Sequence, residues 1–368
     1  MIYSEIIAAL LLVSDWRSRR VRQLVRWAHA RGMVVPRRQP REVYVAFDIN
    51  AIPIRSFFSL FRFEKADLVR LHAGLRMPTH FQLLNRSFVT SMHGLCIILR
   101  RMAYTARHTD LEPLLQRDAT TISRAFTVVA AWLWKKVHAK LHWDENRLKP
   151  ELLQHFAECV QRTAAAQFGV DIGRVWGFLD GTVRGMARPK RHQQAHWSGY
   201  KKKHAIKFQA VMGADGLFAH VSGPYGTKRH DSRMLRQSGL KALMLRCAKD
   251  TMGNQLQVYA DKGYSRSPTI NSPLDRAEAG YEEPMDDDDV RCALTSKRVC
   301  VEWGFGNVVR QWDYLNGEKR LKSLQSPIGQ WYVLGMFLTN CHVTVYGTAA
   351  ANQFNCRAPS LEEYLQYF

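Results

Sequence analysis

The stretch Trp176-Gly177-Phe178-Leu179-Asp180-Gly181-Thr182 is the part of the sequence that decides the expected fold. Its apolar first half is typical of a buried strand, whereas aspartate followed by glycine disfavours a strand. We therefore predict a strand that stops where Asp180 begins. Open α/β sheets bind ligands beyond the carboxyl ends of their strands, so Asp180 would lie where a ligand binds. Most aspartate-glycine pairs simply make turns. A functional role for Asp180 therefore needs support from other parts of the sequence.

Two later segments also place an acid beside apolar residues. The apolar run 256–260 ends on Asp261, and Glu302 lies inside segment 298–306, which has helical character. Together the three acids supply the carboxylate oxygens that hard cations such as Mg²⁺ prefer. The set predicts a centre with two divalent ions for nucleic-acid chemistry. Asp180 would bridge both ions, Asp261 would hold one, and Glu302 would complete the other site.

Four blocks of the sequence, in this order, resemble the DDE blocks of PIF/Harbinger-type transposases, the family of Harbinger transposase-derived nucleases. They are Asp180-Gly181-Thr182, His230-Asp231-Ser232, Ala260-Asp261-Lys262-Gly263-Tyr264 and Val301-Glu302-Trp303-Gly304-Phe305-Gly306. The resemblance runs from about Phe57 to Gly347. It implies an α/β, RNase H-like catalytic core with a mixed sheet and metal-dependent cleavage and transfer of DNA strands.

This resemblance also implies the site residues. The catalytic acids would be Asp180, Asp261 and Glu302, and Asp231 would join them as a metal ligand, with Mg²⁺ or Mn²⁺ as the cofactor. Asp231 has a competing interpretation, because it precedes a predicted helix over 232–240 and would suit its N-cap. The two roles are compatible.

The chain is expected to have four parts. They are a basic N-terminal arm (1–42), an all-α region like a helix-turn-helix (43–148), the RNase H-like catalytic domain (149–347) and a C-terminal tail (348–368). The arm mixes arginines with apolar residues at helical spacing. It is either a solvated helix or tail, or a segment for phosphate contact or nuclear import.

A candidate DNA-recognition element lies in the helical region. A short helical segment after Asp110, a break at 117–118 and a longer helix from Ala119 give the helix-turn-helix layout, which an ordinary helical bundle can share. The resembled family carries such a region here. The candidates for facing DNA are Thr120, Thr121, Ser123 and Arg124.

The charge balance favours a polyanionic partner. Lys and Arg number 53 against 32 Asp and Glu, a formal net charge of +21. A basic loop, which starts at Arg184, follows the predicted metal site. Arg298 lies one helical turn before Glu302, where it could hold that carboxylate or a phosphate. The candidates for DNA contact in the catalytic domain are Lys201, Lys202, Lys203, Lys262 and Arg298.

Other features set limits. Seven scattered cysteines without a CxxC pair argue against a disulfide framework and a structural zinc site, and favour a reducing compartment. The apolar run 6–13 is too short to span a bilayer and lacks a basic flank, so neither a signal peptide nor a membrane helix is expected. Asp215 is assigned to a hairpin turn. The acidic run 286–289 is interpreted as solvated within an irregular loop, 265–294.

Two alternatives to a DDE transposase stay open. One is a domesticated relative that binds DNA without cutting it, and the other is a nuclease that hydrolyses without joining strands. The resemblance further implies transposon ends and target DNA as partners, an accessory Myb-like protein, a homo-oligomer and a nuclear location.

Overall fold

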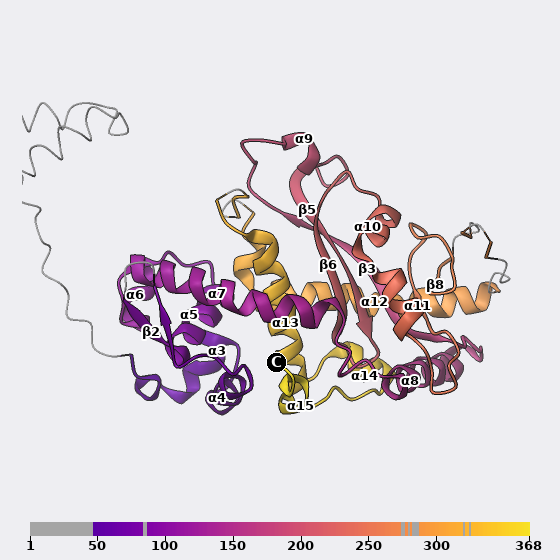
Figure 1. Ribbon diagram of the computed structural model, residues 1–368, viewed down its shortest axis with the longest axis horizontal. Coiled ribbons are helices and arrows are strands. Elements are labelled where there is room, and N and C mark those ends of the chain that lie inside the picture. The colour runs from indigo at the N-terminus through magenta and orange to yellow at the C-terminus, as the bar shows by residue number, and fades with distance from the viewer. Residues whose placement is uncertain are drawn as a thin grey trace, which may run out of the picture. The chain divides into compact units, whose positions relative to one another are not determined.

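The computed structural model describes residues 47–83, 87–273, 277–278, 280–281, 287–318, 321–323 and 325–368. The predicted basic arm and Asp286 lie outside these residues. Phe47–Phe368 forms one compact unit, which is a mixed α/β structure (Figure 1). The predicted boundaries between the four parts stay predictions.

The first portion of this unit is mostly helical, but two short antiparallel strands, β1 and β2, show that the expectation of an all-α region is wrong. Its buried faces pack α5 against α7 and α3 against α5. The Asp118 carboxylate caps α7 by accepting from the backbone N–H of Thr121 at 2.9 Å, so the helix begins after the predicted break. The elements are η1 (Ile49–Ala51), η2 (Ile54–Ser56), α3 (Phe57–Phe61), α4 (Lys65–Gly74), β1 (His80–Gln82), β2 (Phe88–Thr90), α5 (Ser91–Ala103), η3 (Thr109–Leu111), α6 (Glu112–Leu115) and α7 (Ala119–His142).

A mixed sheet carries the centre of the unit. Strand β5 pairs antiparallel with β3 and β6, whereas β7 pairs parallel with β3 and with β8. Strands β3, β5 and β6 run side by side in Figure 1. This arrangement is consistent with the RNase H-like fold. The strands are β3 (Val175–Gly185), β4 (Trp197–Ser198), β5 (Lys203–Gly213), β6 (Phe218–Gly226), β7 (Gln257–Tyr259) and β8 (Ile270–Asn271).

The prediction that the first strand stops at Asp180 is wrong. Strand β3 continues through Asp180 and Gly181 to Gly185, because β5 supplies antiparallel partners over this whole length. Only the parallel partner stops early: β7 is paired with β3 as far as Phe178↔Tyr259. Asp180 therefore lies within one strand but beyond the end of the neighbouring strand, which frees that edge for a site.

Helices pack on this sheet. The helix α8 contacts β3, and α12 contacts β3 and β5 and crosses behind the strands in Figure 1. The helix α12 begins inside the segment predicted as an irregular loop. Asp287 caps it by accepting from Val290 N–H at 2.8 Å, so this part of the acidic run has a structural role. The helices are α8 (Pro150–Phe168), α9 (Gln193–His196), α10 (Asp231–Ser238), α11 (Leu240–Cys247) and α12 (Asp288–Gln311).

The C-terminal elements complete the core. They are η4 (Asp313–Asn316), α13 (Ile328–Tyr346), α14 (Ala349–Phe354) and α15 (Leu361–Leu365). The helix α13 is buried over most of its length, as its apolar sequence predicts, and it packs on α7, α12 and β6. No helix in the described part of the chain combines the length and apolarity needed to cross a membrane.

Candidate active site

Asp180 and Asp261 come from neighbouring parallel strands. Asp180 pairs with Ala210 in the β3–β5 ladder. Asp261 follows β7 almost directly, and its Oδ1 accepts from the Gly263 N–H at 2.9 Å, which holds the carboxylate in a tight turn. The prediction that this second acid lies at the end of a strand is confirmed.

Glu302 reaches the same region from α12 with Arg298 beside it. The Arg298 guanidinium lies 3.3 Å from Asp180 Oδ1 through Nη1 and 3.1 Å from Glu302 Oε1 through Nη2. The expected contact between Arg298 and Glu302 is therefore present. The contact with Asp180 was not foreseen. A single cation joins two of the predicted catalytic carboxylates.

Asp231 belongs to the same group of acids. A methyl group added at Gly263 would lie 3.0 Å from Asp261 Oδ1 and 3.3 Å from Asp231 Oδ2, so both carboxylates face one glycine. Asp231 Oδ1 also accepts from Lys207 Nζ at 2.9 Å. The interpretation of Asp231 as an N-cap is wrong, because the cap of α10 is His230 and Asp231 is the first residue of the helix.

Three of these acids, Asp180, Asp261 and Glu302, interact electrostatically. Burial raises the pKa of Asp180 to about 6, while the Arg298 guanidinium opposes the rise and the charges of Asp261 and Glu302 add to it. A carboxyl group with such a pKa sheds its proton close to neutral pH. Strong perturbation by burial and neighbouring charges is typical of functional sites.

Tyr264 also faces the acids. Its side chain is only 1 % exposed, and its hydroxyl finds no hydrogen-bond partner among the described residues. Burial raises the Tyr264 pKa, and the charges of Asp231, Asp180 and Asp261 raise it further. Tyr264 and Lys207 were missed as site residues. Two signals were present: Tyr264 closes the Asp261 motif, and Lys207 interrupts the apolar run of β5.

The predicted DNA-contacting lysines differ in their surroundings. Lys201, Lys202 and Lys262 are exposed. Lys203, at the start of β5, forms an ion pair with Glu318. The first three are therefore open to a phosphate, whereas Lys203 already has a counter-ion.

The candidates in the helical region also differ. Thr120 is exposed, and Ser123 and Arg124 are partly exposed at the start of α7. Thr121 is 8 % exposed, and its side chain bonds to the Asp118 carboxylate. Thr121 thus supports the cap of α7, and its side chain is the least exposed of the four candidates.

A groove of about 620 Å³ starts at Glu302 and Trp303 and extends past Arg310 to His342 and Tyr346. Trp303 is 44 % exposed at the start of this groove, whereas Phe305 is buried. Because residue 303 falls between the inward positions of α12, its indole lies at the surface beside Glu302.

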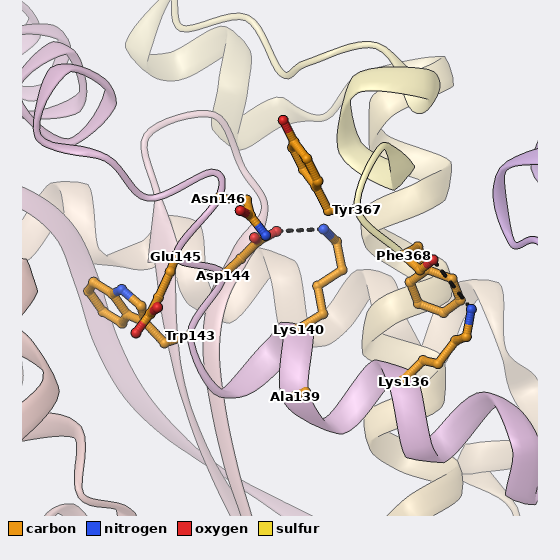
Figure 2. A pocket seen from close by; sticks show the side chains of 9 residues that line it. All are labelled: Lys136, Ala139, Lys140, Trp143, Asp144, Glu145, Asn146, Tyr367 and Phe368. Atoms are coloured by element: carbon orange, nitrogen blue, oxygen red, sulfur yellow. Dashed lines mark hydrogen bonds and ion pairs between the residues drawn. The ribbon is translucent and has the colours of Figure 1, made fainter.

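A second hollow, of about 380 Å³, lies between the end of α7 and the C-terminal residues (Figure 2). Lys140 and Asp144 form an ion pair there, and Lys136 donates to the Phe368 carbonyl oxygen at 3.3 Å. None of the four acids lines this hollow. We assign this hollow no role in catalysis.

The acids suit a divalent cation by their chemistry, since all the side-chain donors are carboxylate oxygens. The Arg298 guanidinium contacts both Asp180 and Glu302, so a positive charge is already accommodated between these two carboxylates. Even so, these acids do not form a compact ligand group. Within the described residues that property belongs to His155, Cys159 and Cys356.

Comparison with known families finds one matching family model. The family model described as DDE superfamily endonuclease matches residues 179–340, a span that contains all four acids. No curated protein and no solved structure matches the chain. Endonucleases of this superfamily act on DNA and use divalent metals. The match, the mixed sheet and the converging acids together support a DDE transposase-like nuclease.

Proposed function

We propose that the chain is a DNA endonuclease and strand transferase of the PIF/Harbinger type. In this proposal Asp180, Asp261 and Glu302 are the catalytic acids, and Asp231 is a further ligand. The observation that carries the proposal is the bridge from Arg298 to both Asp180 and Glu302. It brings together two acids that are 122 positions apart in the sequence, within the span that matches the endonuclease family.

Each residue then has a distinct task. Two divalent ions, Mg²⁺ or Mn²⁺, would activate the attacking water or 3′-hydroxyl and stabilise the leaving oxygen. Asp180 would contact both ions, Asp261 would hold one, and Glu302 would complete the other site. Lys207 holds Asp231 by its ion pair. Arg298 keeps Asp180 and Glu302 aligned and can turn to a phosphate oxygen when those carboxylates bind metal.

The DNA would approach along the exposed cations and the groove beside Glu302. Lys201, Lys202 and Lys262 offer charge to phosphates. Trp303, at the start of the groove, offers a face for stacking a base that has left the duplex. In the helical region, Thr120, Ser123 and Arg124 remain the surface candidates for contacts with transposon ends, in line with the proposed helix-turn-helix-like role.

The wider assignments belong to the same proposal. A nuclear protein that acts as a homo-oligomer with a Myb-like partner fits the PIF/Harbinger resemblance. The net charge of +21 supports DNA as the macromolecular partner.

The test is nicking of supercoiled plasmid by the full chain with Mg²⁺ or Mn²⁺. We compare Asp261→Asn with Asp289→Asn, a control that removes the same charge from an exposed position on α12. We expect nicking by the wild type and Asp289→Asn, none by Asp261→Asn, and similar DNA binding by all three. An oligonucleotide with a free 3′-hydroxyl, joined into the plasmid, reports strand transfer.

The outcomes separate the alternatives. Nicking without joining would replace the transferase by a hydrolytic nuclease. Folded wild-type protein that binds plasmid and transposon-end DNA but cuts neither would favour the domesticated binder. Full nicking by Asp261→Asn would refute the assigned acids.

A further inference from the structure

A second group of potential metal ligands lies outside the carboxylate site. His155 and Cys159 are one turn apart on α8, so their side chains share a helix face. Cys356 follows α14, where Asn355 adopts a left-handed conformation (φ 45°) and turns the chain. One ligand atom from each of the three residues lies within 4.8 Å of the other two.

The spacing of the group suits a tetrahedral ion. The Sγ atom of Cys159 and the Nε2 atom of His155 are 3.6 Å apart. Zinc bonds of about 2.3 Å to sulfur and about 2.0–2.1 Å to nitrogen, at tetrahedral angles, would separate those atoms by about 3.5 Å. The Cys356 thiol interacts with that of Cys159, which brings the second sulfur to the same point.

Burial gives the site a second property. Cys159 and Cys356 are 0 % and 2 % exposed, whereas His155 is exposed. Two buried thiolates would be costly alone, but a divalent cation neutralises them and leaves no net charge when the imidazole is neutral. Arg162 supports negative charge on sulfur by donating to Cys159 Sγ at 3.4 Å. The exposed side of His155 leaves room for solvent as a fourth ligand.

We propose that His155, Cys159 and Cys356 bind a thiophilic divalent cation, for which zinc is the best match. Sulfur and imidazole ligands favour such an ion over the hard cations expected at the acids. The bound ion would fasten the segment after α14 to α8, and α8 packs directly on the strand that carries Asp180. This proposal does not depend on nuclease activity, and it revises the expectation, based on cysteine spacing, that the chain has no structural zinc site.

The test is a titration of the reduced, metal-free full chain with Co²⁺, followed through the near-ultraviolet thiolate-to-cobalt charge-transfer band. The carboxylate site offers no sulfur, so Co²⁺ bound there adds nothing to this band. We expect one saturating equivalent, displaced by Zn²⁺. Cys159→Ser and Cys356→Ser should each weaken the band and the affinity. Cys292→Ser, an exposed thiol on α12, is the matched control and should leave both unchanged.

His155→Ala keeps the test valid if the buried-cysteine variants fail to fold, because His155 is exposed. Loss of this ligand should lower the Co²⁺ affinity at least about tenfold, since even partners outside the ligand shell change metal affinity about 10–100-fold. No band in folded, reduced protein, or an unchanged Co²⁺ affinity in His155→Ala, would overturn the proposal. So would a native Cys159–Cys356 disulfide, found by alkylation and mass spectrometry, in a chain that binds no Co²⁺ after reduction.

Discussion

The carboxylate site and the His155–Cys159–Cys356 group hold potential ligands in different ways. The acids come from separate elements, and Arg298 already occupies the space between Asp180 and Glu302. The second group is compact, mostly buried and built around one face of α8. In the two proposals, exchangeable ions would bind where carboxylates from separate elements are held by a removable cation. A fixed ion would bind where two buried thiols and an imidazole already lie together.

The largest expected effect is a separation of the two sites by mutation. Glu302→Gln removes a ligand from the carboxylate site and should lower DNA cleavage by about 10³-fold or more, the equivalent of several kcal/mol of lost metal assistance. It should leave the thiolate–cobalt band intact. His155→Ala should leave cleavage unchanged and lower the Co²⁺ affinity measured through that band. Cleavage rates and cobalt spectra of both variants measure this, and a loss of both signals in either variant would show that the sites are not independent.

The next effect concerns stability and pH. Because the Asp180 pKa is raised from 3.8 to about 6, the folded chain binds this proton more tightly than the unfolded chain. The contribution of Asp180 to the free energy of unfolding therefore falls as pH rises from about 4 to about 6. At neutral pH the ionised carboxylate costs up to about 3 kcal/mol.

Asp180→Asn removes that cost. In metal-free protein we expect a higher free energy of unfolding at pH 7, by up to about 3 kcal/mol, and no gain near pH 4. Denaturant unfolding at the two pH values measures the difference. If Asp180→Asn lowered the free energy of unfolding equally at both pH values, the ion pair with Arg298 would outweigh the cost of burying the Asp180 charge. The compact thiol group should show no matching gain when Cys159 is replaced.

A smaller effect distinguishes two tyrosines near the acids. The Tyr264 hydroxyl is buried without a partner in the described chain, so Tyr264→Phe should stabilise the protein by about 1 kcal/mol. The Tyr259 hydroxyl bonds to Thr295 at 2.9 Å, and Tyr259→Phe should destabilise it by a similar amount. If Tyr264 donates to a water or ligand among the acids during turnover, Tyr264→Phe will also slow cleavage while Tyr259→Phe will not. Equal shifts in the free energy of unfolding for both variants would contradict this distinction.

The smallest effect concerns the exposed lysines. Lys202→Ala should reduce the slope of log affinity for DNA against log salt by about 1, as expected for the loss of one phosphate contact. Lys203→Ala should change it less, because Lys203 is paired with Glu318. Salt titrations of DNA binding compare the two. If both variants and the wild type had equal slopes, the segment that contains Lys202 and Lys203 would not contact DNA phosphates.

Local sequence predicted much of the carboxylate site. The acids lie in short motifs, and the strand, hairpin and helix that carry Asp261, Asp215 and Glu302 follow from apolar patterning. Asp215 does lie in the turn between β5 and β6, where it pairs with Arg147. The extension of β3 past Asp180 could not be predicted, since pairing with β5 overrides the local preference against a strand.

Other features depend on residues that are far apart in the sequence. The contact between Arg298 and Asp180 joins α12 to β3, and the spacing of residues within either segment does not predict it. The His155–Cys159–Cys356 group has the same character: the i,i+4 pair was visible, but its third member comes from the segment after α14. The exposure of Trp303 depends on helix orientation in the same way: an apolar residue in a helical segment suggests core, but this position on α12 faces outward.

The most direct test of the central claim is a crystal structure of the full chain soaked in Mn²⁺, with anomalous scattering used to locate the ions. We expect manganese among Asp180, Asp231, Asp261 and Glu302, with Arg298 moved away from at least one of its two carboxylates. Manganese elsewhere, with Arg298 still joining Asp180 and Glu302, would contradict the proposal that these acids form the metal-dependent active site.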